Sequence, residues 1–312
     1  MVGKSRITAS TTTSSGSLSS NFDMGPHFLP ELEQLILSHI PESDKETLRT
    51  CATIRRDWVG ISRAADFSKV TLDEKNSLSF LALLQSPLCT IAIPVRSLHI
   101  DDLYPTSEDR YTWIDNDIPK IVSKLPCVTS LSIRSNSRAY VREETLDALI
   151  SAYSDKLTSL SIMRAKFVPT FANAMRFFCA FQVLESLEPL VSWDDNAAPD
   201  GNISLPPRLR NLKVGAAVAA HIFPWTLAHQ PIPPISRLEI SEVTMAMAPD
   251  ISKFITAISA ELLELLVRFD YGEQGALDVI HNNMSLRRRG MLKVIKPDAE
   301  SNEVGELVWQ SS

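Results

Sequence analysis

The first half of the chain contains the stretch Val128-Thr129-Ser130-Leu131-Ser132-Ile133. Apolar residues occupy its first, fourth and sixth positions, and small polar residues fill the others. Because successive side chains of a strand point to opposite faces, this pattern predicts a short strand with one buried face and one polar face. A strand of this length is stable only when other strands lie beside it, so the pattern should recur.

The same spacing of apolar residues does recur along the chain. Copies begin at Val95, Val128, Leu157, Leu209, Ile235 and Leu262. A degraded copy with Leu184 and Leu187 fills the one large gap, and we interpret Leu292 with Val294 as a partial eighth copy. Most copies follow the previous one after about 26 residues, a period typical of solenoids built from strand and helix repeats.

Segments with helical periodicity lie between the predicted strands. Apolar residues recur at intervals of three and four in residues 141–153, 171–181 and 251–262, which predicts a helix in each. Strand and helix alternating at a fixed period predict an α/β fold in the form of a curved solenoid. Over about residues 90–296 the chain resembles the leucine-rich repeat family. The repeat's usual asparagine survives only as Asn136, so we expect an irregular solenoid.

The resemblance to leucine-rich repeats implies where a binding surface would lie. In such a solenoid the strands line the concave face, and their unburied residues meet solvent there. Arginine pairs with carboxylates and phosphates in two-point geometry, so this face suits a polar or acidic protein segment. An ordinary solvated face is the alternative. The candidate substrate-binding residues are His99, Arg134, Lys213, Arg237, Glu239 and Arg268.

Residues 27–71 show a different pattern, with signals for three short helices. Pro30 stands where a first helix would begin, and Pro41 stands where it would end. The stretch Ser43-Asp44-Lys45-Glu46 is a capping box that starts a second helix. A third apolar stripe begins at Trp58. A helical unit this small usually needs a partner surface or an attached domain.

Four pieces follow one another here: Leu-Pro with the apolar stripe of the first helix, Thr47-Leu48-Arg49-Thr50-Cys51-Ala52, Arg56-Asp57-Trp58 and Phe67-Ser68-Lys69-Val70-Thr71-Leu72. Their order resembles the F-box. The stretch 80–91 followed by Val95-Arg96-Ser97-Leu98 further resembles F-box proteins of the type expanded in mushroom-forming fungi. The resemblance implies docking on the Skp-type adaptor of a cullin ubiquitin ligase. The alternative is a stand-alone repeat scaffold in which the helical unit is only a cap. The candidate adaptor-binding residues are Leu29, Pro30, Leu35, Ile36, Leu48 and Trp58.

The composition argues against catalysis by this chain. Glycine is scarce, with 10 residues in 312, and the sequence holds no phosphate-binding loop, nucleophile elbow or zinc-protease motif. The 4 cysteines show no metal or redox spacing. We therefore expect no catalytic residue, metal or cofactor. The F-box resemblance implies that partner subunits carry out ubiquitin transfer and that the substrate is an unidentified protein.

Charge and hydropathy limit the remaining partners. The net charge of −6 disfavours binding to nucleic acid, which needs a basic field. The longest uncharged run, residues 214–236, contains several prolines that break a helix, so we expect no membrane span. The expected location is cytoplasmic or nuclear. We expect a disordered Ser/Thr-rich tail at 1–26, the box at 27–71, the solenoid at 72–296 and an acidic tail at 297–312.

Overall fold

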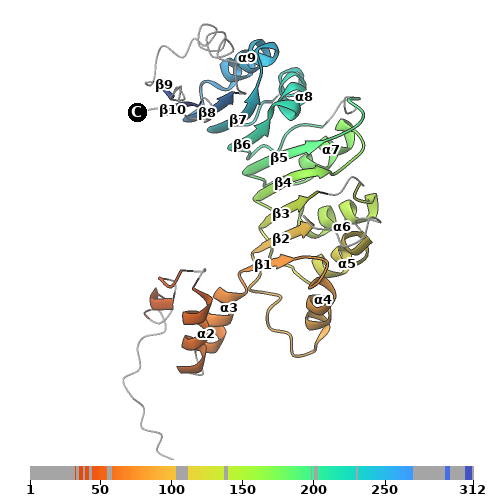
Figure 1. The fold of residues 1–312 in the computed structure, drawn as a ribbon, viewed down its shortest axis with the longest axis vertical. Helices are drawn as coiled ribbons and strands as arrows, with labels where there is room; N and C mark the ends of the chain where they lie inside the picture. Colours follow the sequence, from red (N-terminus) through yellow and green to blue (C-terminus); the bar gives the residue numbers. More distant parts are fainter. Residues whose placement is uncertain are drawn as a thin grey trace, which may run out of the picture.

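The computed structural model describes residues 32, 35–37, 39–41, 44–54, 58–102, 112–136, 140–197, 199, 203–229, 231–269, 292–295 and 306–310. A single sheet of ten strands runs through it, and strands alternate with helices along the chain (Figure 1). The fold is therefore α/β. The strands are β1 (Lys69–Leu72), β2 (Ser97–Asp102), β3 (Ser130–Ser135), β4 (Ser159–Lys166), β5 (Ser186–Ser192), β6 (Asn211–Gly215), β7 (Arg237–Val243), β8 (Glu264–Phe269), β9 (Leu292–Ile295) and β10 (Glu306–Gln310).

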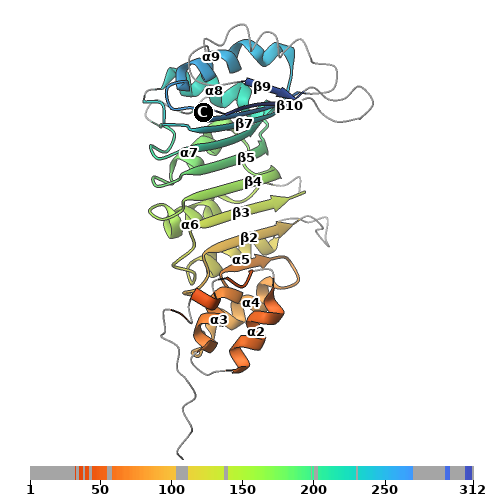
Figure 2. The ribbon, with the colours of Figure 1, turned by 90° about the vertical axis from the view of Figure 1, so that its left-hand side faces the viewer.

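Helices α4 to α9 cover one face of this sheet, and no described helix covers the other face. Figure 1 shows α4 to α9 on the convex side of an arc, and Figure 2 looks onto the opposite side, where the strands lie in front. The helices are α2 (Lys45–Ile54), α3 (Trp58–Asp66), α4 (Ser77–Gln85), α5 (Thr112–Val122), α6 (Glu143–Tyr153), α7 (Phe171–Cys179), α8 (Ala216–Ala228) and α9 (Ala248–Ile258), with a 3-10 turn η1 (Met245–Met247) before α9.

Strands β1 to β8 follow the order of the sequence and are parallel. Their central leucines lie side by side in register, for example Leu98 beside Leu131 and Leu131 beside Leu160. These leucines are 0–1% exposed because the helices pack over them. The apolar pattern of the sequence is thus the buried row of the sheet. The expected alternation of strand and helix is confirmed, and the arrangement is compatible with a solenoid.

A repeated backbone contact joins successive units at the start of each strand. The carbonyl oxygen of Arg96, which precedes β2, accepts hydrogen bonds from the N–H groups of Thr129 (2.8 Å) and Ser130 (3.0 Å) in the next unit. Each such carbonyl therefore satisfies two donors and fixes the rise from one unit to the next. The carbonyls that accept in this way belong to Ser68, Arg96, Thr129, Thr158, Glu185, Arg210 and Ser236.

The structure differs from expectation at several elements. The copy interpreted as degraded is a full strand, β5, which pairs with β4 and β6. Helix α9 begins and ends earlier than the expected 251–262. Helix α8 was not predicted, because it is apolar on nearly every side and contains Pro224, so it lacks a helical stripe.

The two ends of the sheet also differ from expectation. The expected boundary between residues 71 and 72 falls inside β1, which pairs with β2 and therefore belongs to the sheet. The stretch expected as an acidic tail contains β10, which lies between β8 and β9 and is antiparallel to both. It contains Val308 and Trp309, which have high strand propensity. The expected tail at 1–26 lies outside the described residues.

Two helices of the N-terminal region, α2 and α3, are described in full, together with helical residues 32 and 35–37. We refer to these as the helical unit. Its buried apolar residues, Leu37, Leu48 and Cys51, are not part of the main apolar core. In Figure 1 the unit projects from the β1 end on the open side of the sheet.

Candidate functional site

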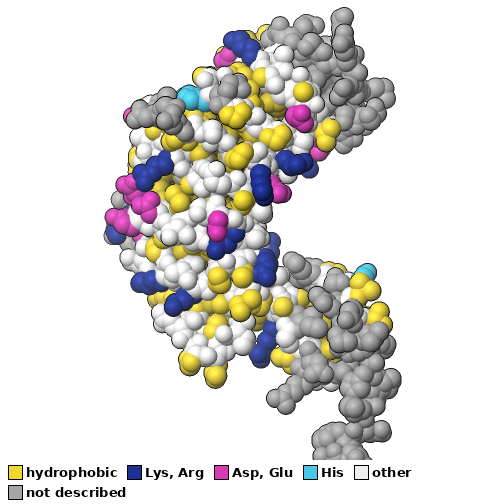
Figure 3. All heavy atoms as spheres, turned by 180° about the vertical axis from the view of Figure 1, so that it is seen from behind, with side chains coloured by type: hydrophobic (Ala, Val, Ile, Leu, Met, Phe, Trp, Pro, Cys, Tyr) yellow, Lys and Arg dark blue, Asp and Glu magenta, His cyan; other side chains and the backbone are white. Residues whose placement is uncertain are grey.

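The open face of the sheet carries the six candidate substrate-binding residues. We define the open face as the strand positions of β1–β8 that alternate with the buried leucine and isoleucine rows. His99 lies on β2, Arg134 on β3 and Lys213 on β6, while Arg237 and Glu239 lie on β7 and Arg268 lies on β8. The parallel register places these residues on the same face. Figure 3 shows, from behind, the hollow that this side of the arc forms, with several basic side chains along it.

Across β4 to β8 the charged side chains of the open face bind one another. The hydroxyl of Ser161 donates to Glu188 Oε2 at 2.8 Å, and Glu188 Oε1 lies 2.8 Å from Lys213 Nζ. Lys213 Nζ lies 3.5 Å from Glu239 Oε1, which accepts from Arg268 Nη1 at 2.6 Å. We call these five residues the charge ladder. Arg237 is paired as well, with its Nε 3.3 Å from Glu264 Oε2.

The charge ladder changes what these residues can offer to a partner. Glu239 is only 9% exposed and lies between two cations. The carboxylate of Glu188, and then that of Glu239, raise the pKa of Lys213. An anionic ligand at Lys213 or Arg268 would compete with these carboxylates for the same positive charge. This half of the open face is therefore a largely neutralised surface.

The β1–β3 end of the open face is different. Lys69 on β1, His99 on β2 and Arg134 on β3 lie on a diagonal of the sheet, each one strand across and two residues further along. Among the described residues, Lys69 makes no ion pair, and Arg134 Nη1 has only Asp101 Oδ2 at 3.9 Å. We call Lys69, His99 and Arg134 the cationic diagonal.

The charged groups around His99 determine the sign of the local electrostatic field at this end of the open face. Its Nε2 lies 3.0 Å from the hydroxyl of Ser97. The pKa of His99 is lowered, first by its partial burial and then by the positive charges of Lys69 and Arg134, which outweigh the opposing effect of Asp101. The local field is therefore positive and favours an anion.

The helical unit exposes apolar side chains although it has a small core of its own. Leu35 is 53% exposed, Ile36 44% and Ile54 62%. Leu48, by contrast, is 1% exposed, which disfavours its expected contact with an adaptor. Its side chain packs α2 against the rest of the unit. Trp58 is half-buried, and its indole nitrogen is buried without a hydrogen-bond partner among the described residues. Leu29 and Pro30 lie outside the described residues.

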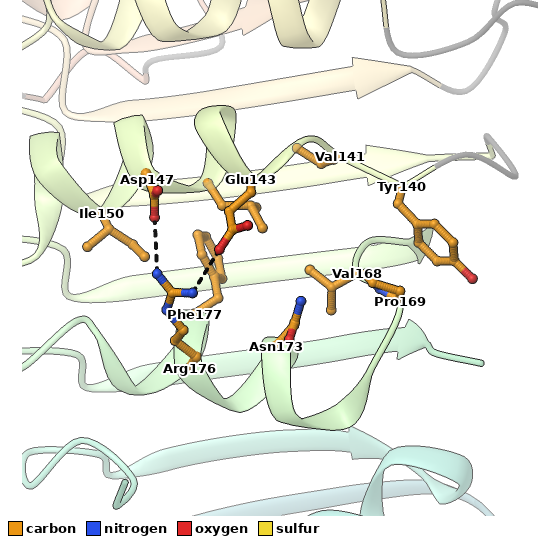
Figure 4. Close-up of a pocket in the computed structure, with 11 residues that line it drawn as sticks. Tyr140, Val141, Glu143, Asp147, Ile150, Val168, Pro169, Asn173, Arg176 and Phe177 are labelled. Carbon is orange, nitrogen blue, oxygen red and sulfur yellow. Dashed lines mark hydrogen bonds and ion pairs between the residues drawn. The ribbon is translucent and has the colours of Figure 1, made fainter. Parts of the chain in front are cut away.

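A small pocket of about 210 Å³ lies between α6 and α7, on the helical side of the molecule (Figure 4). Its lining includes the buried side chains of Val168 and Phe177. At its rim Arg176 lies 2.8 Å from Glu143 Oε1 and 3.6 Å from Asp147 Oδ1. The volume is below that of ordinary ligand sites, and these contacts hold the two helices together.

Sequence reasoning missed several residues of these surfaces. Glu188 follows the buried Leu187 by one position, so the repeat register would have placed it on the open face had β5 been recognised as a full strand. Lys69 was missed because β1 was assigned to the box. Ile54 gave no signal, because it ends a helix whose apolar stripe is short. No group of three or more His, Cys, Asp or Glu in the described part of the chain is arranged to hold a metal ion.

Among the described residues, no helix combines the length and the apolar character that crossing a bilayer requires. No family model matches the chain, and no curated protein matches it.

Proposed function

We propose that the chain is a non-catalytic receptor subunit of a Skp–cullin–F-box ubiquitin ligase. In this proposal the helical unit is an F-box that docks on the Skp-type adaptor. The sheet is an irregular leucine-rich repeat that holds a protein substrate on its open face. Such a receptor would act in the cytoplasm or the nucleus.

One observation carries the proposal. The helical unit buries Leu37, Leu48 and Cys51 in its own core and still leaves Leu35 and Ile36 about half exposed. A leucine-sized side chain contributes about 1.5–3 kcal/mol when it becomes fully buried. Leu35 and Ile36 are adjacent in the sequence, and neighbouring exposed apolar side chains on a unit that already has a core support a docking surface there.

A specific observation also favours the alternative, a stand-alone scaffold with the helical unit as its cap. Helix α3 ends at Asp66 and β1 begins at Lys69, and Phe67 between them packs against the main core. A cap, however, would share its core with the first repeat. The buried residues of the helical unit are separate from the main core, which favours the receptor.

Co-purification with a Skp-type adaptor tests the proposal. The full chain should co-purify with the adaptor, and Leu35→Asp/Ile36→Asp should abolish this, because each change puts a charge into an apolar interface. A matched control is Leu78→Asp/Leu88→Asp, which charges two apolar residues of 67% and 86% exposure outside the helical unit. The control should bind like the wild type. Failure of the wild-type chain to bind would refute the proposal, and equal loss in both variants would show that binding is not through the helical unit.

A further inference from the structure

Both ends of the open face carry basic side chains, but the two ends differ in how closely these side chains are paired with carboxylates. In the charge ladder, cations and carboxylates lie 2.6–3.5 Å apart. At the β1–β3 end, Lys69 has no ion pair within the described part of the chain, and Arg134 has one at 3.9 Å. Exposed pairs at such a distance contribute little. The positive charge of the open face is therefore available at β1–β3.

The spacing of these cations indicates the shape of a ligand. Neighbouring strands are about 4.8 Å apart, and alternate residues of a strand are about 6.6 Å apart. Successive members of the cationic diagonal are therefore about 8 Å apart at their backbones. Alternate side chains of an extended peptide repeat at about 6.6 Å, which flexible lysine and arginine side chains can match. A single small anion could not meet all three residues in this way.

We propose that the cationic diagonal of Lys69, His99 and Arg134 binds an extended protein segment that carries carboxylates at alternate residues. Hydroxyl groups support this assignment, because Thr71 and Ser132 flank His99 in register on the two neighbouring strands and can donate to such a segment. This inference rests on the proposed function in one respect: it takes the open face as the binding surface. It does not depend on the helical unit.

His99 gives the site a predicted pH dependence. The groups that face it are Lys69 on β1, Ser97 and Asp101 on its own strand and Arg134 on β3. A bound carboxylate would raise the pKa of His99, so by linkage the complex takes up a proton. Affinity should therefore rise as the pH falls from neutral toward about 6, a range in which aspartate stays ionised.

The experiment measures binding of a fluorescein-labelled peptide, Gly-Ser-Asp-Ser-Asp-Ser-Asp-Ser-Gly, to the full chain by fluorescence anisotropy. The test variant is Lys69→Gln/Arg134→Gln. The matched control is Lys124→Gln/Arg210→Gln, which removes the same charge from one exposed lysine and one exposed arginine outside the strand positions of the open face. We expect the test variant to lose at least about tenfold in affinity and the control less than about twofold. His99→Gln should remove the pH dependence and keep most of the affinity.

A phosphoserine peptide and adaptor co-purification are used as two further tests of the proposal. Equal losses in the test and control variants, or no binding by the wild type, would overturn the proposal, because binding would then follow net charge or not occur. Tighter binding of a peptide with one phosphoserine in place of the three aspartates would overturn the carboxylate assignment. Adaptor co-purification should be unchanged in Lys69→Gln/Arg134→Gln, so failure of this inference is distinguishable from failure of the proposed function.

Discussion

The ammonium nitrogen of Lys213 lies 2.8 Å from Oε1 of Glu188, across the boundary between β5 and β6. This pair joins two units between which the backbone register is short, since β5 and β6 share only two paired positions. The side-chain bridge therefore adds to the connection between the two halves of the sheet. Because the bridge pairs a cation with a carboxylate, it also helps to neutralise the charge ladder.

The first prediction concerns this bridge. Lys213→Met leaves Glu188 and the mostly buried Glu239 with one cation fewer. We expect the free energy of unfolding to fall by about 1 kcal/mol, because the pairs are partly buried and partly screened. Urea denaturation at low salt measures this. The control is Lys253→Met, which removes an exposed lysine paired with Asp250 on α9 and should cost less than about 0.5 kcal/mol. Equal effects of the two changes would contradict the prediction.

The strands could be predicted from the sequence because their signal is local. The row of Leu98, Leu131 and Leu160 repeats in a fixed frame, and the parallel register places it in one buried layer. The side on which His99 and Arg134 lie followed from the same frame. The charge ladder did not follow, because it depends on which carboxylate stands on the next strand, and Glu188 lies on a strand that the pattern had classed as degraded.

Some of the helices, in contrast, could not be predicted from the sequence. Helix α8 buries residues on nearly all of its sides, so its sequence has no stripe. Helix α5 contains Pro119, which argues against a helix when the sequence is considered alone. Tertiary packing against the sheet decides both. In the helical unit, the apolar pattern could not distinguish the buried Leu48 from the exposed Leu35, because both occupy similar positions in amphipathic stretches.

The second prediction concerns the pH dependence of stability at Asp102. This carboxyl group is 4% exposed and accepts from Trp113 Nε1 at 3.1 Å and from Ser135 Oγ at 3.0 Å. Burial raises the pKa of Asp102 above its ordinary value of 3.8, against the opposing effect of these two hydrogen bonds. As the pH rises above 3.8, the Asp102 carboxyl loses its proton in the unfolded chain before it does so in the folded chain. The contribution of Asp102 to the free energy of unfolding therefore falls as the pH rises through this range.

Replacement by asparagine removes this ionisation and keeps a similar shape. Relative to the wild type, Asp102→Asn should therefore gain stability as the pH rises from about 3.5 to about 6. Urea denaturation of both proteins across this range measures the difference. Parallel pH profiles for the two proteins would show that Asp102 ionises with the same pKa in the folded and unfolded chain.

The third prediction concerns the four cysteines. Cys51 and Cys179 are buried, whereas Cys89 and Cys127 are partly exposed. Burial raises the pKa of Cys179 to about 12, so almost no reactive thiolate forms there at neutral pH. Iodoacetamide should label Cys89 and Cys127 in the native chain and all four cysteines in urea, as measured by peptide mass spectrometry. Native labelling of Cys179 at the rate of Cys127 would contradict its burial in α7.

The last prediction separates the helical unit from the sheet. A chain that begins at Phe67 keeps β1, whereas a chain that begins at Asp73 loses it together with Val70 and Leu72, which are 8% and 1% exposed in the main core. Each of these side chains contributes about 1.5–3 kcal/mol on burial. The free energy of unfolding of the shorter chain should therefore be at least about 3 kcal/mol lower than that of the full chain. The longer one should stay within about 1 kcal/mol of the full chain, since the helical unit has a separate core. Thermal and urea unfolding followed by circular dichroism measure both. If the chain that begins at Phe67 is as unstable as the one that begins at Asp73, the helical unit caps the solenoid, and the scaffold alternative is favoured over the receptor.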